Sequence, residues 1–286
     1  MIDQAPEFVK GHGTENDFVV LFDREAVVDL TPARVRALCD RHRGLGADGV
    51  LRVVPTELSG EVQNQRDTTE WFMDYRNADG SMAEMCGNGV RVFARVLADR
   101  GLETGSEFSI ATRGGPRAVT VTGDEISVDM GPAIPAGIDA APLVAVGGAQ
   151  WPAIPVWFPN PHAVAFVDSV FDAGSLVEPP LVTPAELFPD GVNVEFAAVV
   201  AENHVEFRVF ERGVGETRSC GTGACAVAWA YRQRFPTAAV DAAVTVDVPG
   251  GRLKATQRVD GHWLLAGPTQ MVAQGFIDPQ WWKDNV

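Results

Sequence analysis

The stretches MCGNG, residues 85–89, and SCGTG, residues 219–223, are the part of this sequence that decides its fold. Their cysteines, Cys86 and Cys220, lie 134 residues apart, and the segments YRNADGSMAE and VFERGVGETR, which lead up to them, align at the same offset. A pattern that recurs at a fixed spacing over a long stretch indicates one structural unit present twice. We therefore expect two copies of one α+β unit, with the active site between them.

Further matches extend the repeat on both sides of the cysteines. The aligned segments place Asn77 opposite Glu211. The other matched positions are Gly114-Gly115 with Gly250-Gly251, Gly131-Pro132 with Gly267-Pro268 and, more loosely, Asn16-Asp17-Phe18 with Asn160-Pro161-His162. The uncharged, proline-rich segment after Gly131 is the predicted linker. We place one domain at residues 1–132, joined by 269–286, and the other at residues 133–268.

Short runs rich in β-branched residues predict strands in both halves of the chain. One helix has a complete signal, with Thr31 as its cap, Pro32 in its first turn, and Val35, Leu38, Cys39 and His42 at helical spacing. Two more helices are expected directly after Cys86 and Cys220. Cys39 and Cys225 are interpreted as core packing, because cysteine is among the most buried residue types. The predicted strands are residues 18–22, 49–54, 118–121, 126–130, 205–210 and 244–248.

The composition narrows the classes of function. The chain has 286 residues with 23 Lys or Arg and 38 Asp or Glu, which gives a net charge of −15. Such a negative field repels phosphate backbones and anionic lipids, so we expect neither a nucleic acid nor a membrane as a partner. Residues 140–167 contain no charged side chain, but five prolines there argue against a membrane-spanning helix. The N-terminal residues lack a signal-peptide pattern, and we expect a cytoplasmic protein.

A Cys-Gly-x-Gly turn at the start of a helix combines an anion site with a reactive thiol. The glycines allow tight backbone geometry, and the N–H groups and helix dipole attract negative charge. The same field favours a thiolate, lowering a cysteine pKa from ~8.5 towards ~3.5–7.5. Two such thiols on opposite faces of a tetrahedral carbon suit its inversion, since one removes a proton while the other delivers one. The same two thiols could instead form a disulfide if they lay at bonding distance.

Five motifs resemble those of the diaminopimelate epimerase family and occur in the family's order. They are HGTENDF (12–18), NADGSMAEMCGNG (77–89), NPH (160–162), VNVEF (192–196) and ERGVGETRSCGTGAC (211–225). The resemblance implies an α+β fold of two pseudo-symmetric antiparallel β units, each wrapped around a central helix, and a homodimer. It also implies a cofactor-independent, PLP-independent and metal-free interconversion of LL- and meso-diaminopimelate in lysine and peptidoglycan biosynthesis.

The resemblance assigns roles residue by residue. Cys86 and Cys220 match the catalytic acid and base, and His162 and Glu211 match positions that tune these thiols. The substrate's α-carboxylate would lie at Gly87, Asn88, Gly221 and Thr222. Its distal amino-acid end would be held by Asn77, Asn160, Asn193, Glu211 and Arg212, with Asn16 also lining the pocket. These residue types suit the task, because arginine binds a carboxylate bidentately and asparagine fixes a zwitterion without adding charge.

Two positions depart from the family's pattern, and three other functions are open at this level. Gly49 stands where many members have Gln, and Glu15 where they usually have Gly. A proline-racemase-like enzyme also uses paired cysteines, but its substrate has no second polar end for Asn193, Glu211 and Arg212 to bind. A thiol redox protein would leave those residues without a role, and a non-catalytic amino-acid-binding module would need no thiol in both repeats. The lysines Lys10, Lys254 and Lys283 lie in no site-like motif, which favours chemistry without pyridoxal phosphate.

Overall fold

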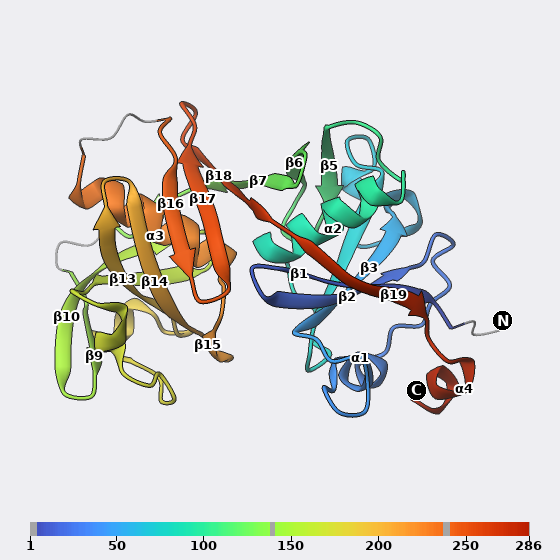
Figure 1. Cartoon of the computed structure of the whole chain (residues 1–286), viewed down its shortest axis with the longest axis horizontal. Coiled ribbons are helices and arrows are strands. Elements are labelled where there is room, and N and C mark those ends of the chain that lie inside the picture. The colour runs from blue at the N-terminus through green and yellow to red at the C-terminus, as the bar shows by residue number, and fades with distance from the viewer. Residues whose placement is uncertain (1–4, 138–140, 237–240, 286) are drawn as a thin grey trace. The chain divides into compact units, whose positions relative to one another are not determined.

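In the computed structural model, which describes residues 5–137, 141–236 and 241–285, the chain folds as two units (Figure 1). Unit 1 comprises Met1–Val128 and Pro268–Val286, and unit 2 comprises Asp129–Gly267. The division falls inside strand β7 (Glu125–Pro132), slightly before the boundary that we placed after residue 132. Each unit has its own set of paired strands and its own long helix.

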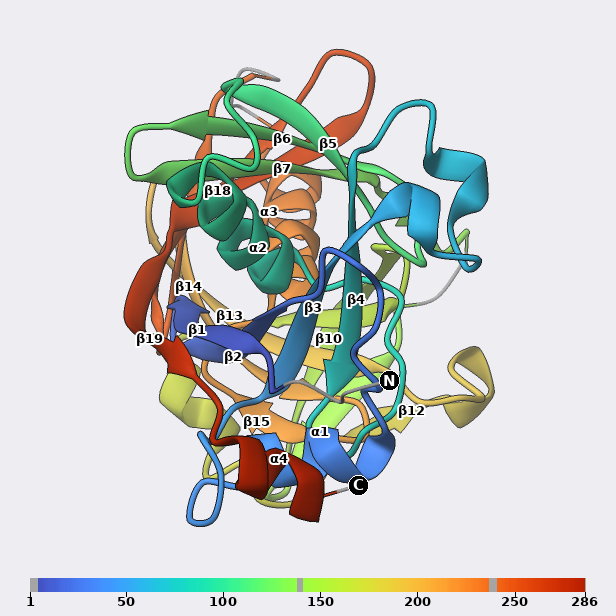
Figure 2. The same ribbon diagram turned by 90° about the vertical axis from the view of Figure 1, so that its right-hand side faces the viewer.

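The described residues of unit 1 form a mixed β structure with the α-helices α1, α2 and α4 (Figure 2). Antiparallel pairs join β1 to β2, β3 to β4, β5 to β6 and β6 to β7, while β2–β3 and β4–β5 are parallel. Strand β19, from the C-terminal part of the chain, pairs antiparallel with β1. The bounds are β1 (Glu7–Gly13), β2 (Asn16–Phe22), α1 (Pro32–Cys39), β3 (Gly49–Pro55), η1 (Thr56–Leu58), η2 (Gln63–Gln65), β4 (Trp71–Asn77), α2 (Gly87–Asp99), β5 (Glu107–Ala111), β6 (Arg117–Thr122), β19 (Gln270–Phe276) and α4 (Pro279–Asp284).

Unit 2 has the same kind of construction around one long helix. Antiparallel pairs join β10 to β11, β13 to β14, β16 to β17 and β17 to β18, while β11–β13 and β14–β16 are parallel. The bounds are β8 (Ile134–Pro135), β9 (Leu143–Val146), β10 (Ala149–Trp157), β11 (Pro161–Phe166), η3 (Val170–Ala173), β12 (Leu181–Thr183), η4 (Ala185–Leu187), β13 (Asn193–Ala201), β14 (His204–Glu211), β15 (Gly215–Thr217), α3 (Gly221–Arg234), β16 (Val244–Val248), β17 (Gly251–Gln257) and β18 (His262–Pro268).

The two units share one order of strand pairing and, in part, one register. Phe18 on β2 pairs with Gly49 on β3, and His162 on β11 pairs with Asn193 on β13, each 144 residues later. The α+β class is confirmed, but the expected antiparallel sheets are mixed. Each parallel pair is joined by a long connection, such as the one through α2 between β4 and β5, which parallel strands require.

The helices that follow the two cysteines are buried, as expected for central helices. Helix α2 contacts β1, β2, β3, β4 and β6, and α3 contacts β10, β11, β13, β14, β16 and β17. Val90, Phe93 and Leu97 repeat at helical spacing on α2 and are fully buried. The small side chains of α3, among them Ala224 and Ala228, are also fully buried, which lets the surrounding strands approach the helix closely.

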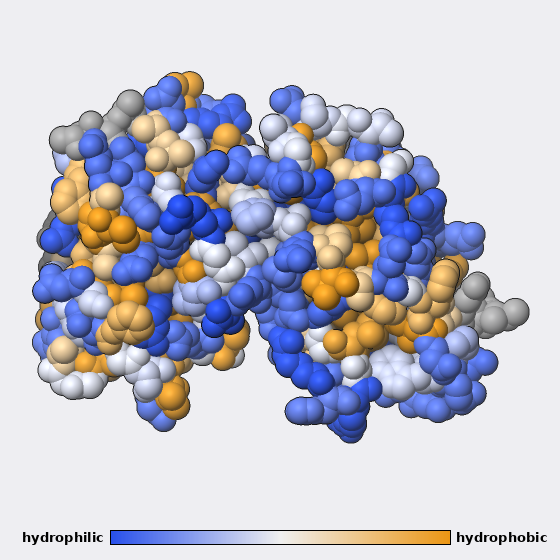
Figure 3. All heavy atoms as spheres, in the orientation of Figure 1, coloured by the Kyte–Doolittle hydropathy of each residue, from blue (hydrophilic) through white to orange (hydrophobic). Residues whose placement is uncertain are grey.

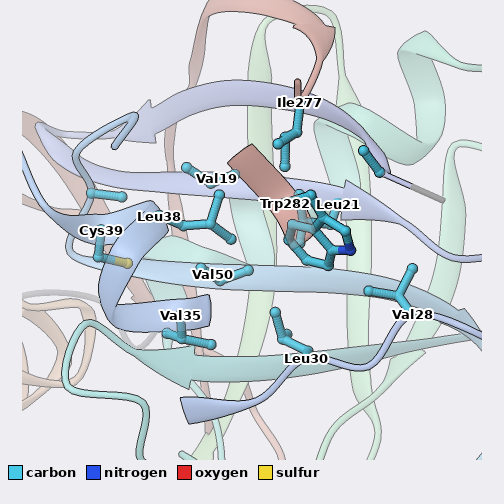
Figure 4. Packing of buried hydrophobic residues seen from close by; sticks show 12 residues of the cluster. Val19, Leu21, Val28, Leu30, Val35, Leu38, Cys39, Val50, Ile277 and Trp282 are labelled. Atoms are coloured by element: carbon cyan, nitrogen blue, oxygen red, sulfur yellow. The ribbon is translucent and has the colours of Figure 1, made fainter. Parts of the chain in front are cut away.

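Helix α1 forms with most of the predicted features, and Figure 4 shows its side chains Val35, Leu38 and Cys39 in the core. The Thr31 side chain accepts a hydrogen bond from the Arg34 amide, and Val35, Leu38 and Cys39 lie in the core cluster with Trp282 of α4. His42 was wrongly included, because α1 ends at Cys39 and the His42 amide donates to the Asp40 side chain in an exposed turn. Asp40 thus ends the helix by offering its carboxylate to backbone groups that would otherwise continue it.

The predicted linker after Gly131 lies just beyond the division between the two units, which falls between Val128 and Asp129. The uncharged segment 140–167 contributes β9, β10 and β11 to unit 2, and residues 138–140 lie outside the described residues. Its apolar side chains, including Val144, Ala153 and Ala163, are fully buried in the core of that unit. Pro152 lies where β10 passes from pairing with β9 to pairing with β11.

The six predicted strands are all present, as parts of β2, β3, β6, β7, β14 and β16. Cys225 is fully buried within α3, as predicted. Hydrophilic and apolar residues are interleaved across the face drawn in Figure 3. Among the described residues, no helix has the length and apolar character needed to cross a membrane.

Candidate active site

Cys86 is the N-cap residue directly before helix α2 and has an extended conformation, with φ −141° and ψ 121°. Its Sγ accepts a hydrogen bond from the Gly89 amide at 3.5 Å and lies 3.6 Å from Oδ1 of Asn16. The same Asn16 oxygen accepts a hydrogen bond from the Asn88 side chain at 3.2 Å. Unit 1 therefore brings together Asn16, Cys86 and Asn88, three of the predicted site residues, beside the first turn of α2.

The Asn16 side chain is held from its other end. Its Nδ2 donates to Oδ2 of Asp48 at 2.8 Å, and Asp48 is in turn bound by Arg41 at 2.8 Å. The carboxylate can only accept, so it turns the Asn16 amide nitrogen towards Asp48 and the amide oxygen towards Cys86. Asp48, which directly precedes Gly49, thus positions Asn16, an effect that the sequence analysis missed.

Cys220 occupies the same position at the start of α3, with φ −124° and ψ 116°. Its Sγ accepts from the Gly223 amide at 3.4 Å, lies 3.4 Å from the Thr222 hydroxyl, and donates to Oε2 of Glu211 at 3.2 Å. Thr217 donates to the other Glu211 oxygen at 2.5 Å. Thiol and carboxylate thus form a hydrogen-bonded pair at the end of β14.

This pair lies in an environment that disfavours negative charge. Burial raises the pKa of the Glu211 carboxyl, and the hydrogen bonds from Thr217 and Cys220 offset this only in part. Burial, followed by the negative charges of Glu211 and Glu195, raises the pKa of the Cys220 thiol well above its usual range. Cys220 is therefore a thiol at neutral pH in the unliganded protein, although it caps a helix N-terminus that would favour the thiolate.

His162 and Glu195 form a fully buried pair beneath this site. Nδ1 of His162 lies 2.6 Å from Oε1 of Glu195, and Nε2 lies 3.0 Å from Oδ1 of Asn160. The strand pairing β11–β13 places the two side chains on neighbouring strands. Glu195 was missed as a site residue; its signal was a charged residue between the apolar Val194 and Phe196 of a strand.

The remaining predicted residues have mainly local contacts. Asn193 is buried, and its Oδ1 accepts the Arg212 amide at 2.9 Å. The exposed Arg212 guanidinium donates to the Asp190 carbonyl at 3.1 Å, and the Asn77 amide donates to Ser81 at 3.0 Å. Gly87 and Gly221 are the first residues of α2 and α3. Side chains that bind only a carbonyl or a hydroxyl are available to a ligand at small cost.

The two departures from the family pattern have structural explanations. A side chain at position 49 would place its Cβ 2.7 Å from both the Tyr75 ring and the Arg76 carbonyl oxygen, so Tyr75 fills the space that a side chain would need. Glu15 has φ 61°, in the left-handed region that favours glycine. Glu15 therefore keeps the backbone of the β1–β2 turn at a cost in strain that glycine would avoid.

Two further features of the described residues bear on ligands. No group of three or more His, Cys, Asp or Glu side chains in the described ranges has the arrangement of a metal site. A cavity of about 560 Å³ is lined by residues of α1 and α4, including Arg36, Cys39 and Trp281, and by none of the predicted site residues. Lys10 contacts Asp17 and the Gly46 carbonyl, as part of a structural charge network.

Sequence comparison places the chain close to one family over most of its length. The family model described as diaminopimelate epimerase matches residues 8–135 and 156–272. A diaminopimelate epimerase of Streptomyces coelicolor is 53% identical over 280 residues, covering 96% of each chain. One of Mycobacterium avium is 48% identical over 294 residues, covering 97% of this chain and 98% of its own.

Solved structures with low sequence identity share the fold. A hydroxyproline epimerase from Agrobacterium vitis has a TM-score of 0.65 at 14% identity, covering 96% of this chain and 91% of its own. A phenazine biosynthesis protein of the PhzF family from Bacillus anthracis has a TM-score of 0.66 at 15% identity, covering 96% and 99%. These likenesses support the α+β fold with two domains and carry no argument about substrate.

Proposed function

This chain belongs to the diaminopimelate epimerase family and is an isomerase that converts LL- to meso-diaminopimelate in lysine biosynthesis, and we propose that Cys86 and Cys220 carry out this reaction as paired base and acid. The observation that supports the proposal most is the equivalent position of the two thiols. Each is the N-cap residue of the central helix of its unit, and each accepts a hydrogen bond from the third residue of that helix. Epimerisation needs two proton-transfer groups, and the duplicated helix start supplies two.

In the proposed reaction, the Cys86 thiolate removes the proton from one α-carbon of LL-diaminopimelate and becomes a thiol. The electron pair left on the carbon is delocalised into the α-carboxylate. The Cys220 thiol then gives its proton to the opposite face of the carbon and becomes a thiolate, which completes the inversion. In the reverse direction the two cysteines exchange roles, so no proton is gained or lost over the reaction.

We propose that the two helix starts bind the substrate's α-carboxylate. The amides of Gly87, Asn88, Gly221 and Thr222 belong to the first turns of α2 and α3, where backbone N–H groups have no partner within the helix. The positive ends of both helix dipoles stabilise the carboxylate, and they do so more strongly when it carries the charge of the carbanion. The same groups thereby lower the barrier to proton removal.

The distal amino-acid end of the substrate would bind a second set of polar groups. Arg212 is exposed and binds only a backbone carbonyl through its guanidinium in the described structure, so it is available to a distal carboxylate. The carboxylate of Glu211 would accept from the distal ammonium group. We propose Asn77, Asn160 and Asn193 as the uncharged groups that fix the orientation of this end, with Asn16 also lining the pocket.

The proposed tuning of the thiols rests on the neighbours of Cys220. Glu211 accepts the thiol hydrogen bond, which keeps the proton on sulfur in the resting enzyme. His162 lies beneath the site with both ring nitrogens facing acceptors. Two thiols that share one proton supply both the acid and the base, so the proposed reaction proceeds without pyridoxal phosphate, metal or another cofactor.

We further propose, from the family resemblance, that the protein is a cytoplasmic homodimer whose product also serves peptidoglycan synthesis. On the protein itself, β19 pairs with β1 along one side and carries the exposed apolar side chains Val272 and Phe276. An exposed strand with such side chains is suited to association with a second copy. Sedimentation of the purified protein at micromolar concentration would give the mass of a dimer if this is correct, and that of a monomer if it is not.

The catalytic roles are tested with Cys86→Ala and Cys220→Ala. Each should lower the rate of LL- to meso-diaminopimelate conversion by about 10²–10⁴-fold, the typical contribution of an acid or base. Cys39→Ala is the matched control, because it removes a thiol from the core cluster and should retain activity in folded protein. Near-normal turnover by either active-site variant would contradict the assignment.

A further inference from the structure

The two helix starts have unlike neighbours on the strands beneath them. In unit 1, a methyl group added at Gly89 would lie 3.4 Å from Cδ2 of Leu51 and 3.5 Å from Cζ of Phe18. In unit 2, a methyl group added at Gly223 would lie 2.9 Å from Oε1 of Glu195. The first turn of α2 therefore packs on hydrocarbon, whereas the first turn of α3 packs on a carboxylate.

The strand registers show that these neighbours occupy equivalent places. Leu51 pairs with Tyr75 across β3–β4, and Glu195 pairs with Val209 across β13–β14. On the adjacent strand, Phe18 of β2 corresponds to His162 of β11 through the shared β2–β3 and β11–β13 register. The apolar pair Phe18–Leu51 of unit 1 is thus replaced by the hydrogen-bonded polar pair His162–Glu195 in unit 2.

Burying such a pair is costly, and the cost argues for a function. Glu195 and His162 are fully buried, and only Oε1 of Glu195 is hydrogen-bonded; Oε2 has no hydrogen-bond partner among the described residues. An apolar pair of similar size is tolerated at the equivalent place in unit 1, so packing does not require charge here. Buried groups of this kind concentrate where they set the protonation of a functional residue.

We propose that Glu195 is a positioning residue that makes the two thiols differ in protonation, so that the proton stays on Cys220. It does so by placing negative charge against the first turn of α3 and by holding His162. Its carboxylate opposes the helix dipole that would otherwise favour the Cys220 thiolate. Nδ1 and Nε2 of His162 lie within hydrogen-bonding distance of Glu195 and Asn160, which fixes the orientation of the ring. The first turn of α2, which follows Cys86, packs on Phe18 and Leu51 instead of a carboxylate, and Cys86 serves as the base in the resting enzyme.

The charged and titratable groups around Cys220 come from three strands and the helix. Glu211 lies on β14, Glu195 on β13 and His162 on β11, and the amide of Gly223 belongs to α3. Both carboxylates act to raise the pKa of Cys220. Removing the charge of Glu195 alone, with Glu211 left in place, should therefore lower the pKa of Cys220 without moving the thiol.

The inference rests on the proposed function, but its test does not need the substrate. We would measure the rates at which iodoacetamide alkylates Cys86 and Cys220 separately, by peptide mass spectrometry, from about pH 6 to about pH 10. The variant is Glu195→Gln, which keeps the shape of the side chain. Glu206→Gln on β14 is the matched control, because it removes the same charge from a half-buried position of the same sheet.

In Glu195→Gln, the midpoint of Cys220 alkylation should fall by about one pH unit, which makes Cys220 react about tenfold faster below that midpoint. Cys86 alkylation, and both thiols in Glu206→Gln, should be unchanged. The pH–rate profile for epimerisation should shift in the same direction, with a loss in kcat that exceeds the change in KM. An unchanged or raised Cys220 midpoint in folded Glu195→Gln overturns the proposal.

A second variant keeps the test decisive if Glu195→Gln does not fold. The double substitution His162→Phe with Glu195→Leu introduces the side chains that unit 1 uses at the equivalent positions and leaves no buried charge unpaired. It should also lower the Cys220 midpoint, and an unchanged midpoint again overturns the proposal. Wild-type protein that fails to epimerise diaminopimelate would overturn the proposed function instead, while the alkylation result would still decide the role of Glu195.

Discussion

Replacing one glycine by alanine in each central helix should have opposite effects on the two units. Gly89 and Gly223 are the third residues of α2 and α3, and both have a helical backbone. Alanine at such a position normally stabilises a helix by about 1 kcal/mol. The difference lies in what the added methyl group would meet.

For Gly89→Ala the nearest atoms lie 3.4 Å away or more, which is ordinary van der Waals contact. For Gly223→Ala the methyl group would lie 2.9 Å from Oε1 of Glu195 and 3.2 Å from Cβ of Cys220. Oε1 cannot simply move away, because it holds His162 at 2.6 Å in a fully buried place. Overpacking a core costs about 1–3 kcal/mol, so the expected net loss is up to about 2 kcal/mol after the helix gain.

The assay is denaturation in guanidinium chloride, followed by circular dichroism, with the two variants and the wild type compared at one protein concentration. Gly89→Ala should leave the free energy of unfolding unchanged or raise it by up to about 1 kcal/mol, and Gly223→Ala should lower it. Gly223→Ala should also change the alkylation rate of Cys220, whereas Gly89→Ala leaves that thiol unaffected. Equal stabilisation by both variants would refute the close packing of Glu195 against α3.

Three other predictions concern binding, charge and the core thiol. Arg212→Met should weaken diaminopimelate binding by about 10–100-fold, through loss of a charged hydrogen bond, while thiol alkylation is unchanged; an unaltered KM would contradict the role of Arg212. Burial opposes the ionisation of Asp17, but hydrogen bonds from Arg41 and Lys10 outweigh it and lower the pKa of Asp17 from 3.8 to about 2. The ionised form therefore adds about 2 kcal/mol of stability above pH 3.8, and this stability is lost as the pH falls towards 2. Asp17→Asn should be less stable than the wild type by this amount at pH 6, and the two proteins should converge in acid. A difference in unfolding free energy that did not depend on pH would contradict this. Burial raises the pKa of Cys39 to about 12, so mass spectrometry should find it unalkylated at pH 8 in native protein and alkylated after unfolding; rapid native labelling would show that Cys39 is not packed in the core.

Much of the fold could be predicted because its signals are local. The glycines after Cys86 and Cys220 mark helix starts, and β-branched runs mark strands, so these elements follow from a few neighbouring residues. The uncharged segment 140–167 shows the limit of such local signals. Its prolines argue against a membrane-spanning helix, but only tertiary contact shows that Val144, Ala153 and Ala163 lie in the core of unit 2.

Candidate site residues could be predicted where they belong to a recognisable motif. They could not be predicted where their effect depends on how deeply the side chain is buried. Cys86 and Asn88 lie next to Asn16 in the structure, as expected for members of one site. Glu195 was missed because its role depends on full burial beside His162 and on its contact with Gly223. Both residues are distant from Glu195 in the sequence. Alternation along a strand gives the face on which a residue lies, but it does not tell whether a charge there will be isolated from water.

The central claim, that two thiols move protons on opposite faces of one carbon, is tested most directly by isotope transfer in deuterated water. During the first turnovers of LL-diaminopimelate, the account predicts meso product with one deuterium at the inverted carbon, while the remaining LL substrate carries none. The product's deuterium would come from the second thiol, which has exchanged with solvent, and the substrate's own proton would stay on the first. Meso product that retains the substrate's original hydrogen would show a single acid–base group and would contradict the account.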